Sequence, residues 1–305
     1  MLKSHRSELF LFVGAIAFAF NGVISKLVLE AGLSAWRLTE IRTTGAFVVM
    51  AAFVVARKPK SLLTTKGELP SLLAFGIIGI AAVQAFYFIG IARLNVSVSL
   101  LIEFTAPIWI VLWLRFVRKK QVSPLMWWGL SLGFTGLMLV AQIWKGMTLN
   151  GIGVIAAFLD AFALAGYFLI GEKLGKTKAS DVMMVWGLGV GSLLFALVQP
   201  WWSFPFSFLT KQINLQGRYA HQSLPGWTLI LWVVLLGTVL PYFCVISGLK
   251  GLSASTSSMI GMLEPILAGG FAWWWLNEAF NGIQLVGAVV VLTGIYFADR
   301  AKSTS

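Results

Sequence analysis

Long apolar segments alternate with short polar ones along the whole chain. Each apolar segment is continuous and long enough to cross a bilayer, for which about 20 helical residues are needed. The pattern predicts spans at about residues 9–29, 37–56, 70–91, 96–116, 123–143, 150–171, 181–200, 227–248, 254–276 and 281–299. Backbone groups in lipid must bond within the protein, and the short alternating segments of a membrane barrel do not occur. The pattern therefore predicts an all-α integral membrane protein with ten transmembrane helices.

The composition agrees with this prediction. Of the 305 residues, 58% are hydrophobic and 11% are charged, whereas an average soluble domain has about 25% charged residues. This difference excludes an ordinary soluble enzyme. The first apolar segment follows Lys3 and Arg6, as a signal peptide would, but it is too long and lacks a convincing cleavage site. We therefore expect it to remain as the first helix.

Basic residues fall mainly in the short polar segments and give the chain a net charge of +12. On the predicted topology, one side of the membrane carries Lys3, Arg6, Arg57, Lys58, Lys60, Lys66, Arg115, Arg118, Lys119, Lys120, Lys173, Lys176, Lys178, Lys250, Arg300 and Lys302. The opposite side carries Arg93, Lys145, Lys211 and Arg218. Because basic residues are enriched in cytoplasmic loops, we expect a cell (inner) membrane protein with both termini cytoplasmic. The charge is interpreted as a topology signal, so no nucleic-acid partner is predicted.

Residues suited to metal or disulfide chemistry are scarce. The chain has one cysteine, Cys244, and two histidines, His5 and His221, both predicted outside the spans. These numbers exclude an internal disulfide and a cysteine metal cluster, and they leave little material for a zinc site. We expect no metal and no cofactor. The predicted partners are a small-molecule substrate and the lipid bilayer.

An internal repeat is found when the sequence is compared with itself at an offset of 158 positions. Identical residues then pair at Gly90 and Gly248, Leu94 and Leu252, Ser97 and Ser255, Ser99 and Ser257, Pro107 and Pro265, Gly129 and Gly287, and Gly136 and Gly294. An offset of 147 pairs Lys26 with Lys173 near the ends of the first and sixth spans, a weaker match. We predict two five-helix repeats, residues 1–147 and 148–305. Because five is odd, the second repeat is inverted in the membrane, and inverted repeats are typical of secondary transporters with a central substrate site.

Two segments carry a resemblance to a known family. "LNVSVSLLIEFTAPIWIVL" and "LSASTSSMIGMLEPILAGG" each place several small residues before a proline, at equivalent positions of the two halves. With ten spans and a glycine-bearing last span in each half, the chain resembles the EamA-type exporters of the drug/metabolite transporter superfamily over nearly its whole length. Within that family it is similar to the YddG-type amino-acid exporters. The resemblance implies efflux of small metabolites such as amino acids through a central cavity, without ATP.

The prolines of these segments, Pro107 and Pro265, lie in the middle of the fourth and ninth spans. A proline inside a helix lacks an N–H and clashes with the carbonyl four residues earlier, here at Glu103 and Gly261. The freed carbonyl must face protein, water or substrate. Two interpretations stay open: hinges in helices that line a pathway, or packing kinks satisfied by a neighbouring Ser or Thr.

Three acidic residues lie deep within predicted spans: Glu103, Glu264 and Asp160. A carboxylate in the membrane is costly, so its favoured environments are a polar cavity, a proton site or an ion pair. Glu264 corresponds to Ala106, about 60° round the helix from Glu103, which predicts that both carboxyls lie on similar faces of equivalent helices. They are candidates for binding a substrate ammonium or a proton. The alternative is a structural carboxyl bonded to a neighbouring helix.

Neutral polar and aromatic residues complete the candidate cavity, namely Asn21, Gln84, Tyr87, Tyr167, Trp186 and Tyr242. Such side chains can hydrogen-bond and stack, although a membrane Tyr or Trp is more often an interface anchor or a core residue. No catalytic residue is predicted.

Charged residues also lie toward the ends of the first two spans. Arg37 and Glu40 can pair on one helix face, and together with Arg42 they are interpreted as an interfacial network rather than a substrate contact. Lys26 is interpreted in the same way. The glycines of the fifth and tenth spans predict close helix packing, either within the chain or across a homodimer, so a monomer and a homodimer both remain open.

These features favour a secondary transporter that exports small metabolites by alternating access. Aromatic or other neutral amino acids are the favoured substrates, and drugs or amphipathic amines are the alternative. Few basic residues lie within the spans, which disfavours carriers of phosphate esters. A membrane-embedded enzyme is the alternative from a different class, because three acids could act in acid–base pairs, but no nucleophile–base set accompanies them. A channel also remains open.

Overall fold

The computed structural model describes residues 2–94, 96–142, 144, 150–277 and 281–301. In this part of the chain, ten helices are long and apolar enough to cross a membrane: His5–Glu30, Ala35–Arg57, Leu69–Ile91, Val98–Val117, Pro124–Ala141, Gly151–Gly175, Ser180–Val198, Gly226–Gly248, Ala254–Leu276 and Gly282–Arg300. The ten predicted spans are confirmed, and their ends differ from the prediction by a few residues. The predicted boundary between residues 147 and 148 lies outside the described residues, as do Lys145 and Lys302.

Some spans are single helices and others are interrupted. The single helices are α1 (Leu2–Glu30), α2 (Ala35–Arg57), α7 (Pro124–Ala141), α8 (Gly151–Gly175), α9 (Ser180–Val198) and α14 (Gly282–Arg300). The third span consists of α3 (Leu69–Ala74), the π-helical η2 (Phe75–Ala82) and α4 (Val83–Ile91), and the eighth of α10 (Gly226–Val234), the π-helical η7 (Leu235–Val239) and α11 (Leu240–Gly248). The fourth contains α5 (Val96–Glu103), α6 (Ala106–Leu112) and the π-helical η3 (Trp113–Val117), and the ninth contains α12 (Ala254–Gly261) and α13 (Leu263–Leu276).

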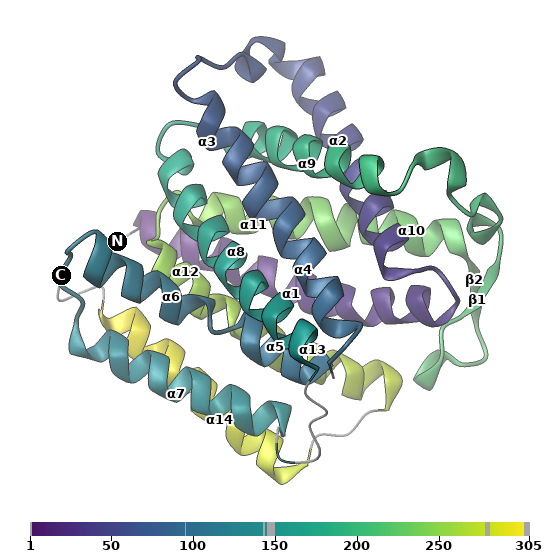
Figure 1. Cartoon of the computed structure of the whole chain (residues 1–305). Coiled ribbons are helices and arrows are strands. Elements are labelled where there is room, and N and C mark those ends of the chain that lie inside the picture. The colour runs from purple at the N-terminus through teal and green to yellow at the C-terminus, as the bar shows by residue number, and fades with distance from the viewer. Residues whose placement is uncertain (1, 95, 143, 145–149, 278–280, 302–305) are drawn as a thin grey trace.

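Residues 199–225, here named the hairpin segment, connect α9 to α10. They contain three 3₁₀ turns, η4 (Trp201–Ser203), η5 (Phe206–Leu209) and η6 (Gly217–Tyr219), and two antiparallel strands, β1 (Gln212–Asn214) and β2 (Ser223–Pro225). A further 3₁₀ turn, η1 (Pro59–Leu62), follows α2. Figure 1 shows that α1 begins and α14 ends at one end of the bundle, the terminal end, whereas the β1–β2 pair lies at the opposite, hairpin end.

The helices pack in a pattern that relates each span to the span five positions later. α1 packs against α11 and α13, and its counterpart α8 packs against α4, α5 and α6. α2 packs against its own counterpart α9, and α7 against its counterpart α14. Exchanging the two halves therefore returns these contacts. This is the arrangement expected of two inverted repeats related by a pseudo-two-fold axis.

Helix interruptions also recur at equivalent places. The fourth span breaks after Glu103, just before Pro107, and the ninth breaks at Met262, just before Pro265. Phe104 and Met262 are equivalent at the 158-residue offset. The π-helical segments of the third and eighth spans overlap at the same offset. A proline or a π-bulge is the usual cause of such a break.

The glycines of α7 and α14 allow these two helices of the same chain to pack closely together. A Cβ placed on Gly129 would lie 2.8 Å from the Gly294 carbonyl oxygen, and one on Gly136 would lie 2.7 Å from the Gly287 oxygen. The two backbones are therefore in direct contact. Small residues permit this approach in membrane helix pairs, and Figure 1 shows the two helices side by side along one edge of the bundle.

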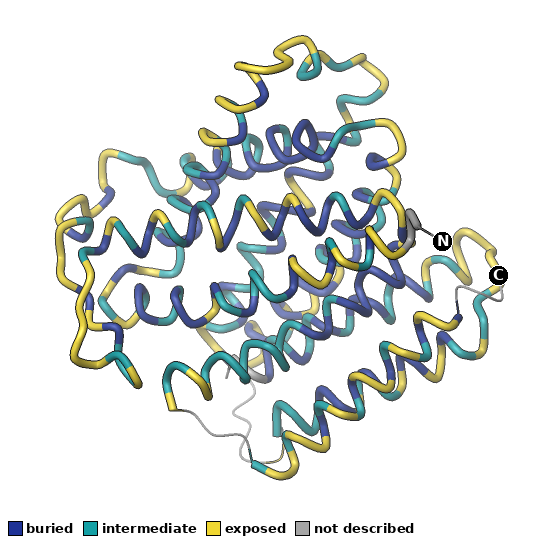
Figure 2. Tube along the Cα trace, turned by 180° about the vertical axis from the view of Figure 1, so that it is seen from behind, coloured by how far each residue is buried: buried dark blue, intermediate teal, exposed yellow. Residues whose placement is uncertain are grey.

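Exposed positions run along the outer faces of the bundle, including that of α14 (Figure 2). On α14 these are apolar side chains, among them Leu285, Val286 and Val289. An apolar outer surface is suited to contact with lipid tails. The buried positions instead lie between helices and around the centre of the bundle.

Candidate functional site

A cavity of about 780 Å³ lies between the helices. At the hairpin end its lining reaches Glu30 and Leu276, the last residues of α1 and α13. Toward the terminal end it stops at Leu11 of α1, Phe168 of α8 and Ser257 of α12, each short of the end of its span. The cavity therefore reaches the hairpin end and is closed toward the terminal end. Its volume falls in the usual range for small-molecule sites, about 300–1,000 Å³.

Most of the candidate residues line this cavity: Asn21, Gln84, Tyr87, Glu103, Pro107, Tyr167, Tyr242, Glu264 and Pro265. Two candidates do not. Asp160 on α8 is completely buried outside the lining, and neither carboxyl oxygen has a hydrogen-bond partner in the described part of the chain. Trp186 lies at the terminal end, where its indole N–H donates to the carbonyl of Leu62 at 3.3 Å.

Two of the three cavity carboxyls, Glu103 and Glu264, come from equivalent helices. Glu103 ends α5, and Glu264 lies in the first turn of α13, beside the two breaks described above. They are close enough to interact electrostatically. The Oε2 atom of Glu103 is buried without a hydrogen-bond partner. The helix breaks thus place two acidic side chains on the wall of one cavity.

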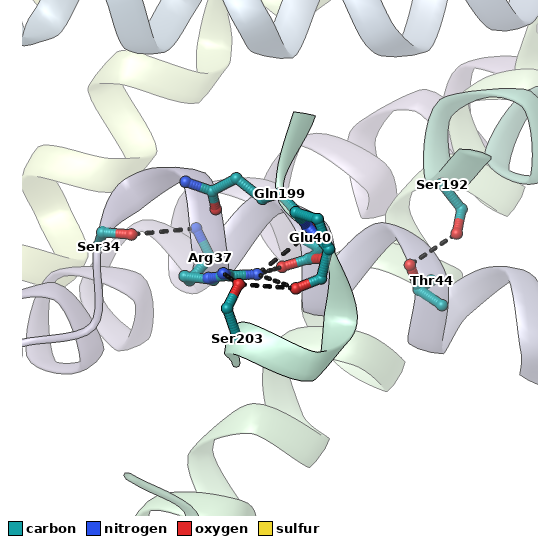
Figure 3. Close-up of polar contacts among 8 residues, drawn as sticks. Ser34, Arg37, Glu40, Thr44, Ser192, Gln199 and Ser203 are labelled. Carbon is teal, nitrogen blue, oxygen red and sulfur yellow. Dashed lines mark hydrogen bonds and ion pairs between the residues drawn. The ribbon is translucent and has the colours of Figure 1, made fainter. Parts of the chain in front are cut away.

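A hydrogen bond crosses the centre of the molecule between equivalent residues. Gln84 of α4 donates its amide N–H to the Tyr242 hydroxyl of α11 at 3.2 Å, and the two positions are 158 residues apart. Thr44 of α2 and Ser192 of α9 also join the two halves, at 2.6 Å, although these two positions are not equivalent (Figure 3). A contact between equivalent residues must lie on or near the pseudo-two-fold axis. Gln84 and Tyr242 also line the cavity, so the axis passes through the site.

The cavity wall carries unusual polar atoms. The side-chain oxygens of Asn21, Ser25, Tyr167 and Ser257, all lining residues, are buried without a hydrogen-bond partner, as is Glu103 Oε2. Buried polar atoms are normally paired with protein or water. These oxygens belong to lining residues but are themselves shielded from water, and Asn21 Oδ1 lies against Gly237 of η7. No group of three or more metal-ligating side chains occurs among the described residues.

Aromatic rings supply much of the remaining wall. Tyr242 meets Phe18 edge-on at 5.2 Å between ring centroids and Tyr167 at 6.2 Å. Tyr87, Phe88 and Phe104 also line the space. Aromatic side chains bind apolar groups and stack on other rings. The site can therefore hold a molecule that combines charged and apolar parts.

The charged network predicted on the second span divides into two parts. Arg37 pairs with Glu40 at 2.5 Å and also donates to Ser203 and to the Gln199 and Pro200 carbonyls, which ties α2 to the hairpin segment (Figure 3). The predicted Arg37–Glu40 pair is confirmed. Arg42 is not part of it.

Arg42 instead lines the cavity, so its interpretation as an interfacial residue is wrong. Five residues after Arg37, it lies about 140° further round the helix, and the two side chains must leave on different sides. The five-residue spacing in the sequence could therefore have predicted that Arg37 and Arg42 lie on different sides of α2. Lys26, also interpreted as interfacial, likewise lines the cavity.

A ten-helix bundle with a cavity between two inverted repeats defines the class of multi-pass membrane transporters. The sequence matches the model of the EamA-like transporter family over residues 5–142 and again over residues 151–298. The chain belongs to this family.

Similar proteins are also transporters. The chain is 23% identical to the uncharacterized transporter YdfC of Bacillus subtilis over 288 residues, which cover 94% of this chain and 88% of YdfC. It is 24% identical to the threonine/homoserine exporter RhtA of Salmonella typhimurium over 270 residues, covering 87% of this chain and 80% of RhtA. One solved structure, described as "Crystal structure of protein", shares the fold with a TM-score of 0.78 at 16% identity, covering 98% of both chains. These relatives support small-molecule transport across a membrane.

Proposed function

We propose that this protein is a secondary exporter of small metabolites that carry an amino group, with neutral and aromatic amino acids as its main substrates. Transport proceeds by alternating access and without ATP. The observation that carries the proposal is one cavity on the pseudo-two-fold axis, whose lining reaches the hairpin end and stops short of the terminal end. Exchanging the conformations of the repeats closes that end and opens the other. The similarity to RhtA, a threonine/homoserine exporter, supports the substrate class.

The acidic wall recognises the amino group of the substrate. Glu103 and Glu264 both line the cavity and offer carboxylate oxygens as acceptors for an ammonium group. An ammonium group has three N–H donors and no acceptor, so it matches such a surface. The aromatic wall then receives the apolar side chain of the substrate. A second candidate, export of drugs or amphipathic amines, is favoured by the same aromatic and acidic lining.

A transport screen tests the proposal. Purified protein in liposomes is offered radiolabelled amino acids and amphipathic amines, with and without an imposed pH gradient. We expect saturable uptake of neutral amino acids and its loss in Glu103→Gln or Glu264→Gln. Glu68→Gln serves as the control, because Glu68 lies before α3 and outside the cavity. Uptake equal to empty liposomes for every compound would refute the proposal, and wild-type rates in both cavity variants would refute the role of the acids.

Coupling to protons is tested with the same system. If one of Glu103→Gln, Glu264→Gln and Asp160→Asn loses the dependence on the pH gradient but keeps exchange, that residue carries the proton. If transport by the wild type does not depend on the pH gradient, the protein acts by facilitated diffusion.

The prolines act as hinges in this proposal. Pro107→Ala and Pro265→Ala restore a helical N–H and straighten the fourth and ninth spans. By the inverted repeat, we expect the two variants to hold opposite states. Cysteines placed on the two ends of the cavity report this as protection at one end and exposure at the other. If both variants show the wild-type accessibility and transport, the prolines are packing features and not hinges.

Topology and assembly complete the proposal. We propose an inner-membrane protein with cytoplasmic termini, two repeats divided at residues 147 and 148, and function as a monomer or a homodimer. In a Cys244→Ala background, an impermeant thiol reagent on intact cells should label a cysteine beside Arg218 and not one beside Lys119. The reverse pattern contradicts the topology. Mass measurement in detergent separates monomer from homodimer.

A further inference from the structure

Arg42 places a cation on the cavity wall. It lies about two turns into α2 and donates Nε–H to the Thr238 hydroxyl at 3.2 Å and an Nη2–H to the Gly237 carbonyl at 3.4 Å. Both partners belong to η7, the π-helical segment of the eighth span. A guanidinium has five N–H donors, so these two contacts orient it and leave donors for a ligand. No ion pair of the described part of the chain includes Arg42.

The other arginine of α2 shows what a structural role looks like here. Arg37 pairs with Glu40 and bonds to Ser203 and two backbone carbonyls. Its charge is thereby compensated within the protein. Arg42 has a neutral hydroxyl and one carbonyl as partners, so its charge is not compensated by contact.

Arg42 also satisfies the Gly237 carbonyl, whose helical N–H partner is lost at Pro241, but no cation occupies the equivalent place in the other half. Arg42 of α2 contacts Gly237 and Thr238 of η7. In the other half, Gly187 of α9 lies against Ile80 of η2, the residue 158 positions before Thr238. The counterpart of Arg42 is therefore Gly187, and an apolar contact fills the equivalent place in the second half. An arginine within a membrane span is costly. Because only one of the two repeats carries an arginine at this place, its energetic cost indicates a role in binding a ligand.

The opposite charge needed for a zwitterion lies across the same space. Glu264 is within electrostatic range of Arg42, but the two are not paired. An α-amino acid carries its carboxylate and its ammonium on a single carbon atom, so it can reach both groups at once. Arginine binds carboxylates through two parallel N–H bonds, which adds geometric selectivity.

We propose that Arg42 binds the carboxylate of the substrate and makes the cavity selective for zwitterionic amino acids over amines. This inference rests on the proposed function and names its substrate class. Lys26 is the other basic lining residue, one turn from the hairpin end of α1, and it is the competing position for the carboxylate.

The test compares three probes that differ only at the carboxylate: phenylalanine, phenylalaninamide and phenethylamine. Each is offered to wild type, Arg42→Gln, Arg42→Lys and Lys26→Gln in liposomes. We expect the wild type to prefer phenylalanine over both other probes by at least about tenfold. Arg42→Gln should lose that preference while keeping phenethylamine transport within about twofold, and Arg42→Lys should fall between, because lysine cannot bind in the bidentate way. Lys26→Gln should keep the preference.

Several outcomes overturn the inference. If the wild type transports phenylalanine and phenylalaninamide equally, the inference is refuted. This result needs no variant, so the inference can be tested even if Arg42→Gln does not fold. An unchanged preference in Arg42→Gln refutes it while leaving the proposed function intact, and a preference lost in Lys26→Gln alone moves the carboxylate site to Lys26. Wild-type protein that transports none of the probes or other amino acids overturns the proposed function and this inference together.

Discussion

The contact between α7 and α14 predicts a large effect from a single added methyl group. In Gly136→Ala the new Cβ would lie 2.6 Å from the Val291 nitrogen and 2.7 Å from the Gly287 oxygen. Non-bonded heavy atoms pack comfortably at about 3.5–4.0 Å, so relief requires a separation of roughly 1 Å. Both neighbours are backbone atoms of α14. No side-chain rotation can relieve the clash, and the two helices must move apart.

The magnitude follows from two opposing terms. Overpacking a close contact costs about 1–3 kcal/mol. Alanine is favoured over glycine in a helix by about 1 kcal/mol. We therefore expect Gly136→Ala to lower the free energy of unfolding by about 0–2 kcal/mol relative to the wild type, and by about 1–3 kcal/mol relative to a glycine-to-alanine change without the clash.

Unfolding in mixed micelles with increasing SDS, followed by circular dichroism, measures this difference. Gly282→Ala is the matched control, because it introduces the same methyl group into α14 where no atom lies within 4 Å of the new Cβ. We expect the control to equal or exceed the wild type. If Gly136→Ala unfolds at the same SDS fraction as the control, the backbone contact between α7 and α14 is wrong.

Two further predictions concern the cavity and the terminal end. Gly22 lines the cavity with no atom within 4 Å of its Cβ position, so Gly22→Trp should abolish uptake in liposomes while unfolding like the wild type; normal uptake would show that the substrate takes another route. Glu68 accepts hydrogen bonds from Lys178 at 2.8 Å and from the Thr65 N–H, which lower its pKa from 4.5 to about 2. Because the pKa of Glu68 is lower in the folded protein than in the unfolded chain, its ionised carboxylate stabilises the fold above about pH 4.5. This contribution is lost as the pH falls from about 4.5 to about 2. Melting temperatures across this window should fall less in Glu68→Gln than in the wild type, and parallel curves would contradict the prediction.

Much of the fold could be predicted because the bilayer imposes a simple rule. A span needs a fixed length of apolar residues, so ten segments of that length predicted ten helices. The mid-span prolines predicted the interruptions at Pro107 and Pro265, because proline cannot complete a helical hydrogen bond. The three π-helical segments, η2, η3 and η7, were not predicted. η7 does have a comparable signal, because Pro241 lacks the N–H that would bond to the Gly237 carbonyl, whereas η2 and η3 have no such proline.

The candidate site was predictable in part. Glu103 and Glu264 were identified because a carboxyl in a membrane span is rare and costly, and both line the cavity. Asp160 met the same criterion yet lies buried outside the lining. Arg42 was misassigned because sequence distance groups it with Arg37, whereas helix rotation separates them.

The sequence by itself determined the number of spans, the duplication and the chemical types that the membrane interior contains. These follow from local properties: apolar length, residue identity and repetition. Tertiary structure alone decided which polar side chains share one space, because that depends on the rotation and tilt of each helix against neighbours from the other repeat. The Gln84–Tyr242 bond joins residues 158 positions apart, and Arg42 meets Gly237 across a similar distance in the chain. Only the packing of the two repeats against each other brings such residues to one cavity.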